Sequence, residues 1–82
     1  MGYILVVDDQ EMNRNILVRR LSKKGFDLLE AENGPDTLDL IEKKDIDLVL
    51  LDIRMPGMDG NEVLETIRKT RSSTELPVIM VT

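Results

Sequence analysis

Short apolar runs alternate with segments of helical periodicity along this chain. Residues 3–7, 47–51 and 76–81 are nearly all apolar, the pattern of parallel strands that are covered on both faces. Residues 27–32 mix glutamate with apolar residues and fit an edge strand with one side open to water. Strands that are separated by helices require right-handed crossovers, and therefore a parallel sheet. The sequence predicts an α/β domain of three layers.

The segments between these runs carry the signals of amphipathic helices. Three helices are expected, at residues 10–24, from Asn33 to about Lys44, and from Asp59 to about Ser72. The apolar stripe of the first consists of Met12, Ile16, Leu17 and Leu21. Gly25 follows the first helix as a stop, and Pro35 suits the first turn of the second. Asp59 and Glu62 have the spacing of a capping box at the start of the third.

Length and composition exclude several classes of protein. A chain of 82 residues forms one domain at most, and its net charge of -5 argues against a surface for nucleic acid or anionic membranes. It has no cysteine and no histidine, which excludes disulfides, thiolate metal sites and a histidine base. No secretory signal and no apolar run of membrane-spanning length is present. We therefore expect a cytoplasmic protein whose chemistry depends on carboxylates, hydroxyls, amines and backbone.

Carboxylates follow two of the predicted strands. Asp8 and Asp9 come directly after the first apolar run, and Asp52 comes directly after the third strand in the sequence. If these two strands are neighbours, the three carboxylates lie within a few ångströms, where their repulsion would raise a pKa unless a cation neutralised it. Oxygen ligands favour Mg²⁺ over zinc, and the backbone carbonyl near Arg54 would complete the set of protein ligands to the metal. A carboxylate beside Mg²⁺ can attack a phosphoryl group to give an aspartyl phosphate, and Thr82 at the fourth strand's end could donate a hydrogen bond to a phosphoryl oxygen.

Simpler structural roles are open for each of these residues. Asp8 and Asp9 could cap the first helix, a common use of aspartate before a helix start. Asp52 could be a turn residue before residues 55–57, and Thr82 could be an ordinary β-branched strand residue. Four methionines are expected to serve packing or turns and not to bind metal: Met12, Met55, Met58 and Met80.

Five motifs together resemble the receiver domain of two-component response regulators. They are Val6-Val7-Asp8-Asp9, Asn33-Gly34, residues 47–52, residues 55–60 and residues 77–82. The resemblance implies a flavodoxin-like parallel sheet, with strands in the order 2-1-3-4-5 in a full receiver. It also implies a phosphoacceptor signalling domain of a two-component phosphorelay, and not an enzyme.

The resemblance further implies a role for each residue of the acidic site. Asp52 would accept a phosphoryl group from a histidine kinase, a phosphotransfer protein or a small phosphodonor. Asp9, Asp52 and the Arg54 carbonyl would bind Mg²⁺ directly, and Asp8 would act through a water molecule. The Thr82 hydroxyl would contact the phosphoryl group and start the conformational switch.

The C-terminus departs from the family pattern. In receivers the fifth strand ends with a lysine that contacts the phosphate, whereas residues 1–82 reach only the fourth strand. We therefore expect an incomplete receiver with strand order 2-1-3-4. It would lack the fourth helix, the fifth strand and the fifth helix. The apolar fourth strand would then be an exposed edge, which predicts a homodimer or swapped assembly.

Two other functions compete with phosphoacceptance. One is a truncated, non-switching fragment that mainly self-associates. The other is an aspartate-nucleophile phosphohydrolase, but that class places its two aspartates two residues apart, whereas here Asp8 and Asp9 are adjacent and Gln10 follows.

Overall fold

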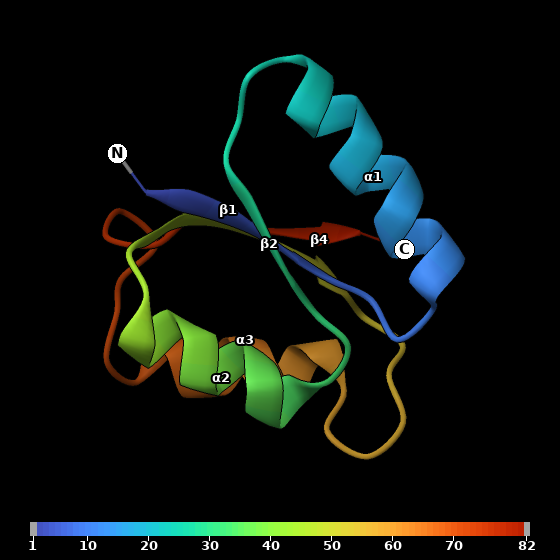
Figure 1. The fold of residues 1–82 in the computed structure, drawn as a ribbon. Helices are drawn as coiled ribbons and strands as arrows, with labels where there is room; N and C mark the ends of the chain where they lie inside the picture. Colours follow the sequence, from blue (N-terminus) through green and yellow to red (C-terminus); the bar gives the residue numbers. More distant parts are fainter. Residues whose placement is uncertain (1, 82) are drawn as a thin grey trace.

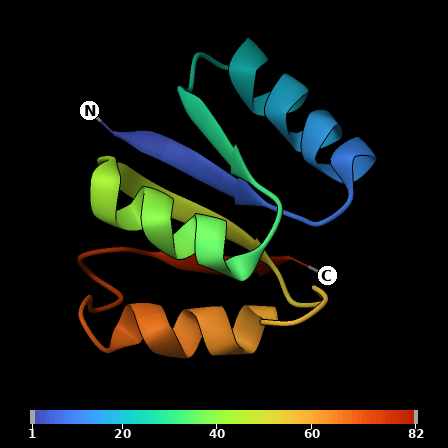
Figure 2. The same cartoon turned by 60° about the horizontal axis from the view of Figure 1, so that its bottom comes forward.

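Four parallel strands form the centre of the structure, a computed structural model that describes residues 2–81. The strands are β1 (Tyr3–Val7), β2 (Leu28–Ala31), β3 (Ile46–Asp52) and β4 (Val78–Val81), and their order in the sheet is β2-β1-β3-β4. The helices are α1 (Glu11–Lys23), α2 (Gly34–Lys43) and α3 (Gly60–Arg68). Helix α1 lies on one face of the sheet, and α2 and α3 lie on the other (Figures 1 and 2). The predicted three-layer fold and strand order are confirmed.

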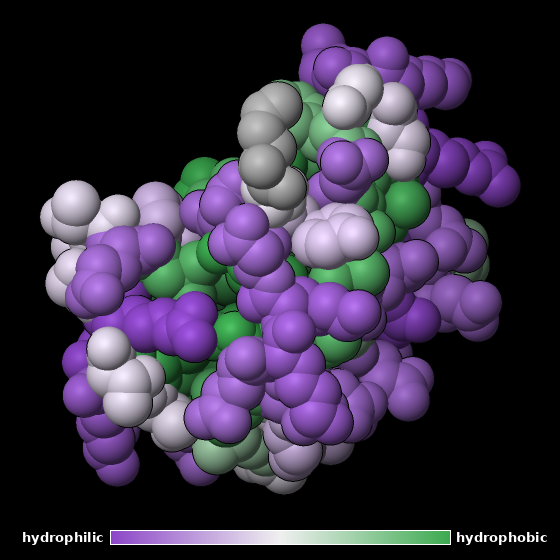
Figure 3. Space-filling view, turned by 60° about the vertical axis from the view of Figure 1, so that its left-hand side comes forward, coloured by the Kyte–Doolittle hydropathy of each residue, from purple (hydrophilic) through white to green (hydrophobic). Residues whose placement is uncertain are grey.

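The main core lies between the sheet and helices α2 and α3. Because successive strand residues point to opposite faces, Leu5 and its β3 neighbour Val49 lie on the same face, as do Val7 and Leu51. These side chains pack against buried residues of both helices and of the α3–β4 connection: Ile41, Val63, Ile67 and Leu76. On the face that Figure 3 shows, green apolar atoms are visible between purple polar side chains.

The opposite face is covered much less completely. Helix α1 contacts β1 and β2 but contributes no buried residue. Met12 is 78% exposed and Ile16 is 50% exposed, so the expected packing of Met12 is wrong. Helical spacing correctly identified the residues that share a face of α1. Strands β1 and β2 contact α1, but no element of the described chain covers the rest of that face. On the bare side, Ile79 of β4 is 53% exposed.

The prediction that residues 76–81 form a strand covered on both faces is therefore wrong for the described chain. β4 is an edge strand, as the resemblance to receivers implied for this length of sequence. The strand also begins later, at Val78, because Leu76 belongs to the connection, where its carbonyl accepts a hydrogen bond from the Arg68 guanidinium at 2.8 Å. β2 lies at the other edge, as predicted.

Helix starts follow the local signals closely, whereas α3 ends at Arg68, before the expected end near Ser72. Asn33 caps α2 by accepting a hydrogen bond from the Asp36 N–H at 2.8 Å, and Asp59 caps α3 through the Glu62 N–H at 3.0 Å. Among the described residues, no return bond from the Glu62 side chain completes the expected capping box. After α1, Gly25 has a φ of 91°, a conformation that glycine adopts without steric cost. None of the helices described is both long and apolar enough for a membrane span.

Candidate functional site

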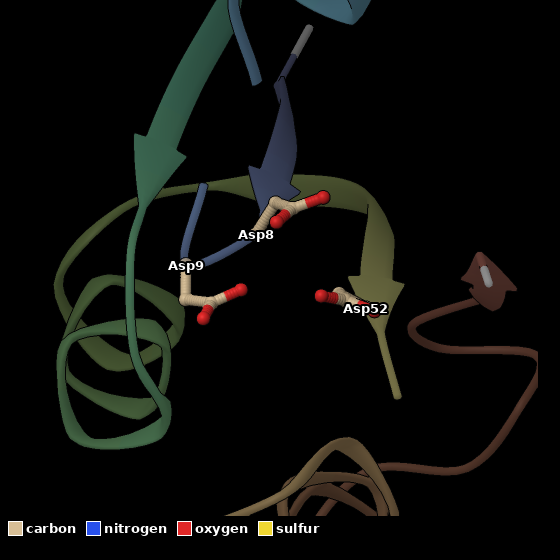
Figure 4. Close-up of side chains that lie close together, drawn as sticks. All are labelled: Asp8, Asp9 and Asp52. Atoms are coloured by element: carbon tan, nitrogen blue, oxygen red, sulfur yellow. The ribbon is translucent and has the colours of Figure 1, made fainter. Parts of the chain in front are cut away.

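Three carboxylates converge at the carboxyl ends of β1 and β3. These strands are neighbours, with Val7 opposite Leu51, so the residues that follow them emerge side by side. One carboxylate oxygen from each of Asp8, Asp9 and Asp52 lies within 4.8 Å of the others. Figure 4 shows the three side chains around a common space. The structure thus brings together three of the residues that the sequence analysis singled out.

Hydrogen bonds hold the loop between β1 and α1 in shape. The Asp8 carboxylate accepts from the Gln10 N–H at 2.9 Å, and the Asp8 carbonyl accepts from the Arg14 guanidinium at 2.7 Å. The residue at the N-cap of α1 is Gln10, which makes no side-chain capping bond. Asp8 and Asp9 therefore do not cap α1, and the exposed Asp9 carboxylate is left for other partners.

The loop between β3 and α3 closes tightly behind Asp52. The Arg54 N–H donates to Asp52 Oδ1 at 3.1 Å, and the Gly60 N–H donates to the Ile53 carbonyl at 2.9 Å. Gly57 turns the loop with a φ of 78°. Asp52 does make the local bond of a turn residue, but it is also partly buried and directed toward Asp8 and Asp9 (Figure 4).

The methionines of this loop serve packing, as expected. Met55 is only 7% exposed and belongs to the main core. Met58 lies against Gly34 at the start of α2, where a Cβ on the glycine would be 2.6 Å from the methionine sulfur. The start of α2 is thereby placed directly beside the β3–α3 loop.

The electrostatics of the cluster disfavour an unpaired charge on Asp52. Burial raises the pKa of the Asp52 carboxyl above its usual value of 3.8, and the charges of Asp8 and Asp9 raise that pKa further. The hydrogen bond from the Arg54 N–H lowers it in part. A cation among the three carboxylates would remove the repulsion. All three side chains offer oxygen, which suits a hard cation such as Mg²⁺.

A cavity of about 520 Å³ opens beside these carboxylates. Besides the carboxylates, its polar lining includes Gln10, Asn13 and Arg54, and Val81 lies at its β4 side. Sequence reasoning identified Arg54 only through its carbonyl and missed Asn13, although a polar residue one turn after an acid pair is a usable signal. The remaining candidate, Thr82, lies outside the described residues.

Comparison with known proteins assigns the family. The model of the response regulator receiver domain matches residues 4–82. The chain belongs to the response regulator receiver family. The resemblance deduced from the five motifs is therefore confirmed, together with its flavodoxin-like sheet.

Solved receiver structures superimpose closely on this one. A CheY-like receiver from Methanospirillum hungatei JF-1 is 34% identical with a TM-score of 0.88, over 99% of this chain and 64% of that one. The response regulator TrrA of Thermotoga maritima, in complex with Mg²⁺-BeF, is 40% identical with a TM-score of 0.89, over 98% of this chain and 68% of that one. A chain of the complex of histidine kinase ThkA with TrrA is 40% identical with a TM-score of 0.90, over 100% of this chain and 69% of that one. The present receiver chain thus spans about two thirds of the length of these proteins.

Proposed function

We propose that this receiver is a phosphoacceptor domain of a two-component phosphorelay, and that Asp52 accepts the phosphoryl group. The observation that carries the proposal is the convergence of Asp8, Asp9 and Asp52 within 4.8 Å beside an open cavity. The TrrA complex with Mg²⁺-BeF supports the same interpretation, because a receiver that is 40% identical binds that pair of groups.

Mg²⁺ is the metal that this donor set fits, because every ligand is an oxygen. Asp9, Asp52 and the Arg54 carbonyl would hold it, with Asp8 acting through a water molecule. When bound, the ion supplies positive charge for the transferring phosphoryl oxygens. The receiver itself contributes the ligands and, through the Arg54 N–H bond to Oδ1, a fixed plane for the Asp52 carboxylate.

In the transfer step, a carboxylate oxygen of Asp52 forms a bond to phosphorus. The bond between phosphorus and the donor's histidine nitrogen breaks, and its electron pair returns to the imidazole. The donor would be a histidine kinase or a phosphotransfer protein, and a kinase is favoured by the complex of ThkA with TrrA. Thr82 would contact a phosphoryl oxygen through its hydroxyl, since its chain neighbour Val81 lines the same cavity.

Phosphorylation by a small donor tests this function without knowledge of the kinase. The 82-residue chain is incubated with phosphoramidate and Mg²⁺ and followed by intact-mass spectrometry, with peptide mapping of the modified residue. One phosphoryl group on Asp52 is expected, with none on Asp52→Asn. The exposed Asp39, which forms an ion pair with Lys43 at 3.1 Å, provides a matched control in Asp39→Asn, which should be modified like the native chain. Modification at another residue, or none, would contradict the proposal.

We also propose that the 82-residue receiver chain pairs with a second copy through β4. The strand is an edge with unpaired backbone groups, and Ile79 on it is 53% exposed. Light scattering coupled to size exclusion should give the mass of a dimer, and a monomer at every concentration would contradict the proposal.

The comparisons give no support to the alternative that the chain only self-associates. The cytoplasmic location and the incompleteness of residues 1–82 stay predictions.

A further inference from the structure

We infer that Arg14 is a positioning residue, which holds the loop with Asp8 and Asp9 in the conformation that binds the metal. The inference rests on the proposed Mg²⁺ site. Arg14 belongs to no motif noted in the sequence, and it does not line the cavity beside the three carboxylates. Its effect on the site would pass through the backbone of the loop.

Arg14 connects three elements of the fold. Its side chain leaves α1 and is only 13% exposed. One guanidinium nitrogen, Nη1, donates to the Asp8 carbonyl at 2.7 Å, and Nε donates to the Glu30 carboxylate on β2 at 3.2 Å. The planar guanidinium makes both bonds at once because its donors have a fixed angular separation. The end of β1, the start of α1 and the middle of β2 are thereby joined through one side chain.

The bond to Asp8 matters because its acceptor is the peptide group between the two acids. The orientation of that peptide sets the directions in which the Asp8 and Asp9 side chains leave the backbone. Other support comes from hydrogen bonds: the Asp8 N–H donates to the Ala31 carbonyl at 3.2 Å, the Gln10 N–H donates to Asp8 Oδ1, and the Asn13 amide donates to Gln10 Oε1 at 2.9 Å. None of these bonds is made to the Asp8 carbonyl, and α1 contributes no buried side chain that would fix the loop by packing. Arg14 therefore provides a restraint on this peptide that packing does not supply.

The geometry separates this role from simple neutralisation of charge. Arg14 bonds to a backbone carbonyl and to Glu30, and it makes no hydrogen bond to the carboxylate oxygens of Asp8, Asp9 or Asp52 among the described residues. The ligand oxygens stay free for a cation. Partners that orient metal ligands without contacting the metal typically change metal affinity by about 10- to 100-fold when they are removed.

Mg²⁺ titrations of the 82-residue chain, followed by amide NMR, test the inference. Arg14→Met keeps the apolar stem but removes both hydrogen bonds, and should weaken Mg²⁺ binding by about tenfold or more. Arg14→Lys should recover part of the affinity, because a single ammonium can still reach the Asp8 carbonyl. Glu30→Gln, which leaves that bond in place, should stay within about twofold of the native chain.

A matched control removes a positive charge elsewhere on α1. Arg20 is exposed in the last turn, so Arg20→Met changes the net charge by the same amount as Arg14→Met. Loss of a positive charge by itself favours cation binding, so Arg20→Met should bind Mg²⁺ at least as tightly as the native chain. If Arg20→Met or Glu30→Gln weakens Mg²⁺ binding as much as Arg14→Met does, the effect does not come from the bond to the Asp8 carbonyl and the positioning role is wrong. Equal affinity of Arg14→Met and the native chain would also overturn it.

A second readout separates this inference from the proposed function. In metal-free protein, hydrogen exchange of the Gln10 amide reports on the loop directly, because that N–H is bonded to Asp8. Arg14→Met should speed this exchange while the amide of Leu5 in β1 stays protected. Unchanged exchange at Gln10 would contradict the role of Arg14 whether or not the native chain binds Mg²⁺. A native chain that binds no Mg²⁺, but whose Gln10 exchange depends on Arg14, would refute only the proposed function.

Discussion

Gly60, the first residue of α3, lies directly against the carbonyl of Asp52, the last residue of β3. A Cβ at position 60 would overlap that carbonyl and would lie 2.8 Å from the α-carbon of Ile53. The absence of a side chain at Gly60 thus lets the end of β3 and the start of α3 meet backbone to backbone. This contact fixes where the proposed phosphoacceptor leaves its strand.

Gly60→Ala should destabilise the fold and disturb the acidic site. The added methyl group meets backbone that cannot rotate away, and overpacking of this kind costs about 1–3 kcal/mol. Urea unfolding measures the loss. Gly57→Asn is the control, because no atom lies within 4 Å of a Cβ there and asparagine tolerates its positive φ. Equal stability of Gly60→Ala and the native chain would show that the close contact is absent in solution.

Asp52→Asn should stabilise the metal-free receiver at neutral pH. Because the folded-state pKa of Asp52 is raised above 3.8, the native state binds more protons than the unfolded chain between 3.8 and that raised pKa. The free energy of unfolding therefore falls as pH rises through this interval, and the unfavourable effect of the ionised carboxylate is complete once the pH exceeds the raised pKa. The asparagine variant would lack this effect, and its advantage should vanish below pH 3.8.

Thermal unfolding as a function of pH, with a chelator present, tests the sign of this linkage. Asp39→Asn serves as a control for loss of one negative charge at an exposed position. A native chain that is more stable than Asp52→Asn at neutral pH would mean that the three carboxylates do not repel one another as the structure implies.

Added Mg²⁺ should stabilise the native chain, and a chelator should reverse the effect. Binding to the folded state alone contributes about 1.4 kcal/mol at a concentration ten times Kd. Asp9→Asn should lose most of this gain, because it removes a ligand without disturbing any hydrogen bond that the structure assigns to Asp8. Thermal unfolding at matched ionic strength is the measurement. Similar stabilisation of both chains would place Mg²⁺ elsewhere on the receiver.

Ile79→Lys should shift the 82-residue chain toward the monomer. Charged residues on an edge strand oppose pairing with another chain, and because Ile79 is 53% exposed its replacement removes little of the core. Light scattering at several concentrations measures the change, with Glu65→Lys on the exposed side of α3 as the control. An Ile79→Lys chain with the same mass as the native one would exclude β4 as the contact.

Local signals predicted most of the elements of this fold. The cap at Asp59 acts within its own helix, so a sequence of a few residues was enough to recognise it. The clustering of Asp9 and Asp52 was predictable because the carboxyl ends of neighbouring parallel strands meet at one edge of a sheet. Each of these inferences depends on chain direction and spacing alone.

Features that depend on tertiary contact were not predictable in this way. The spacing of Ile16 and its neighbours shows which residues share a face of α1, but not whether another element covers that face. The bond from Arg14 to the Asp8 carbonyl requires a particular packing of α1 against the sheet. Likewise, the close approach of Gly60 to Asp52 involves two backbones and leaves no pattern of side chains in the sequence.

The poor burial of α1 limits how long the acidic site stays assembled. A helix of 13 residues is marginal by itself in water, and this one has no buried side chain to hold it against the sheet. Segments with so few apolar contacts open locally at a lower free energy than the whole domain. Because Asp8 and Asp9 lead directly into α1, each such opening would release two of the three acids. We therefore expect the proposed phosphorylation site of the 82-residue chain to lose its geometry when α1 opens, while the core between the sheet and helices α2 and α3 stays folded.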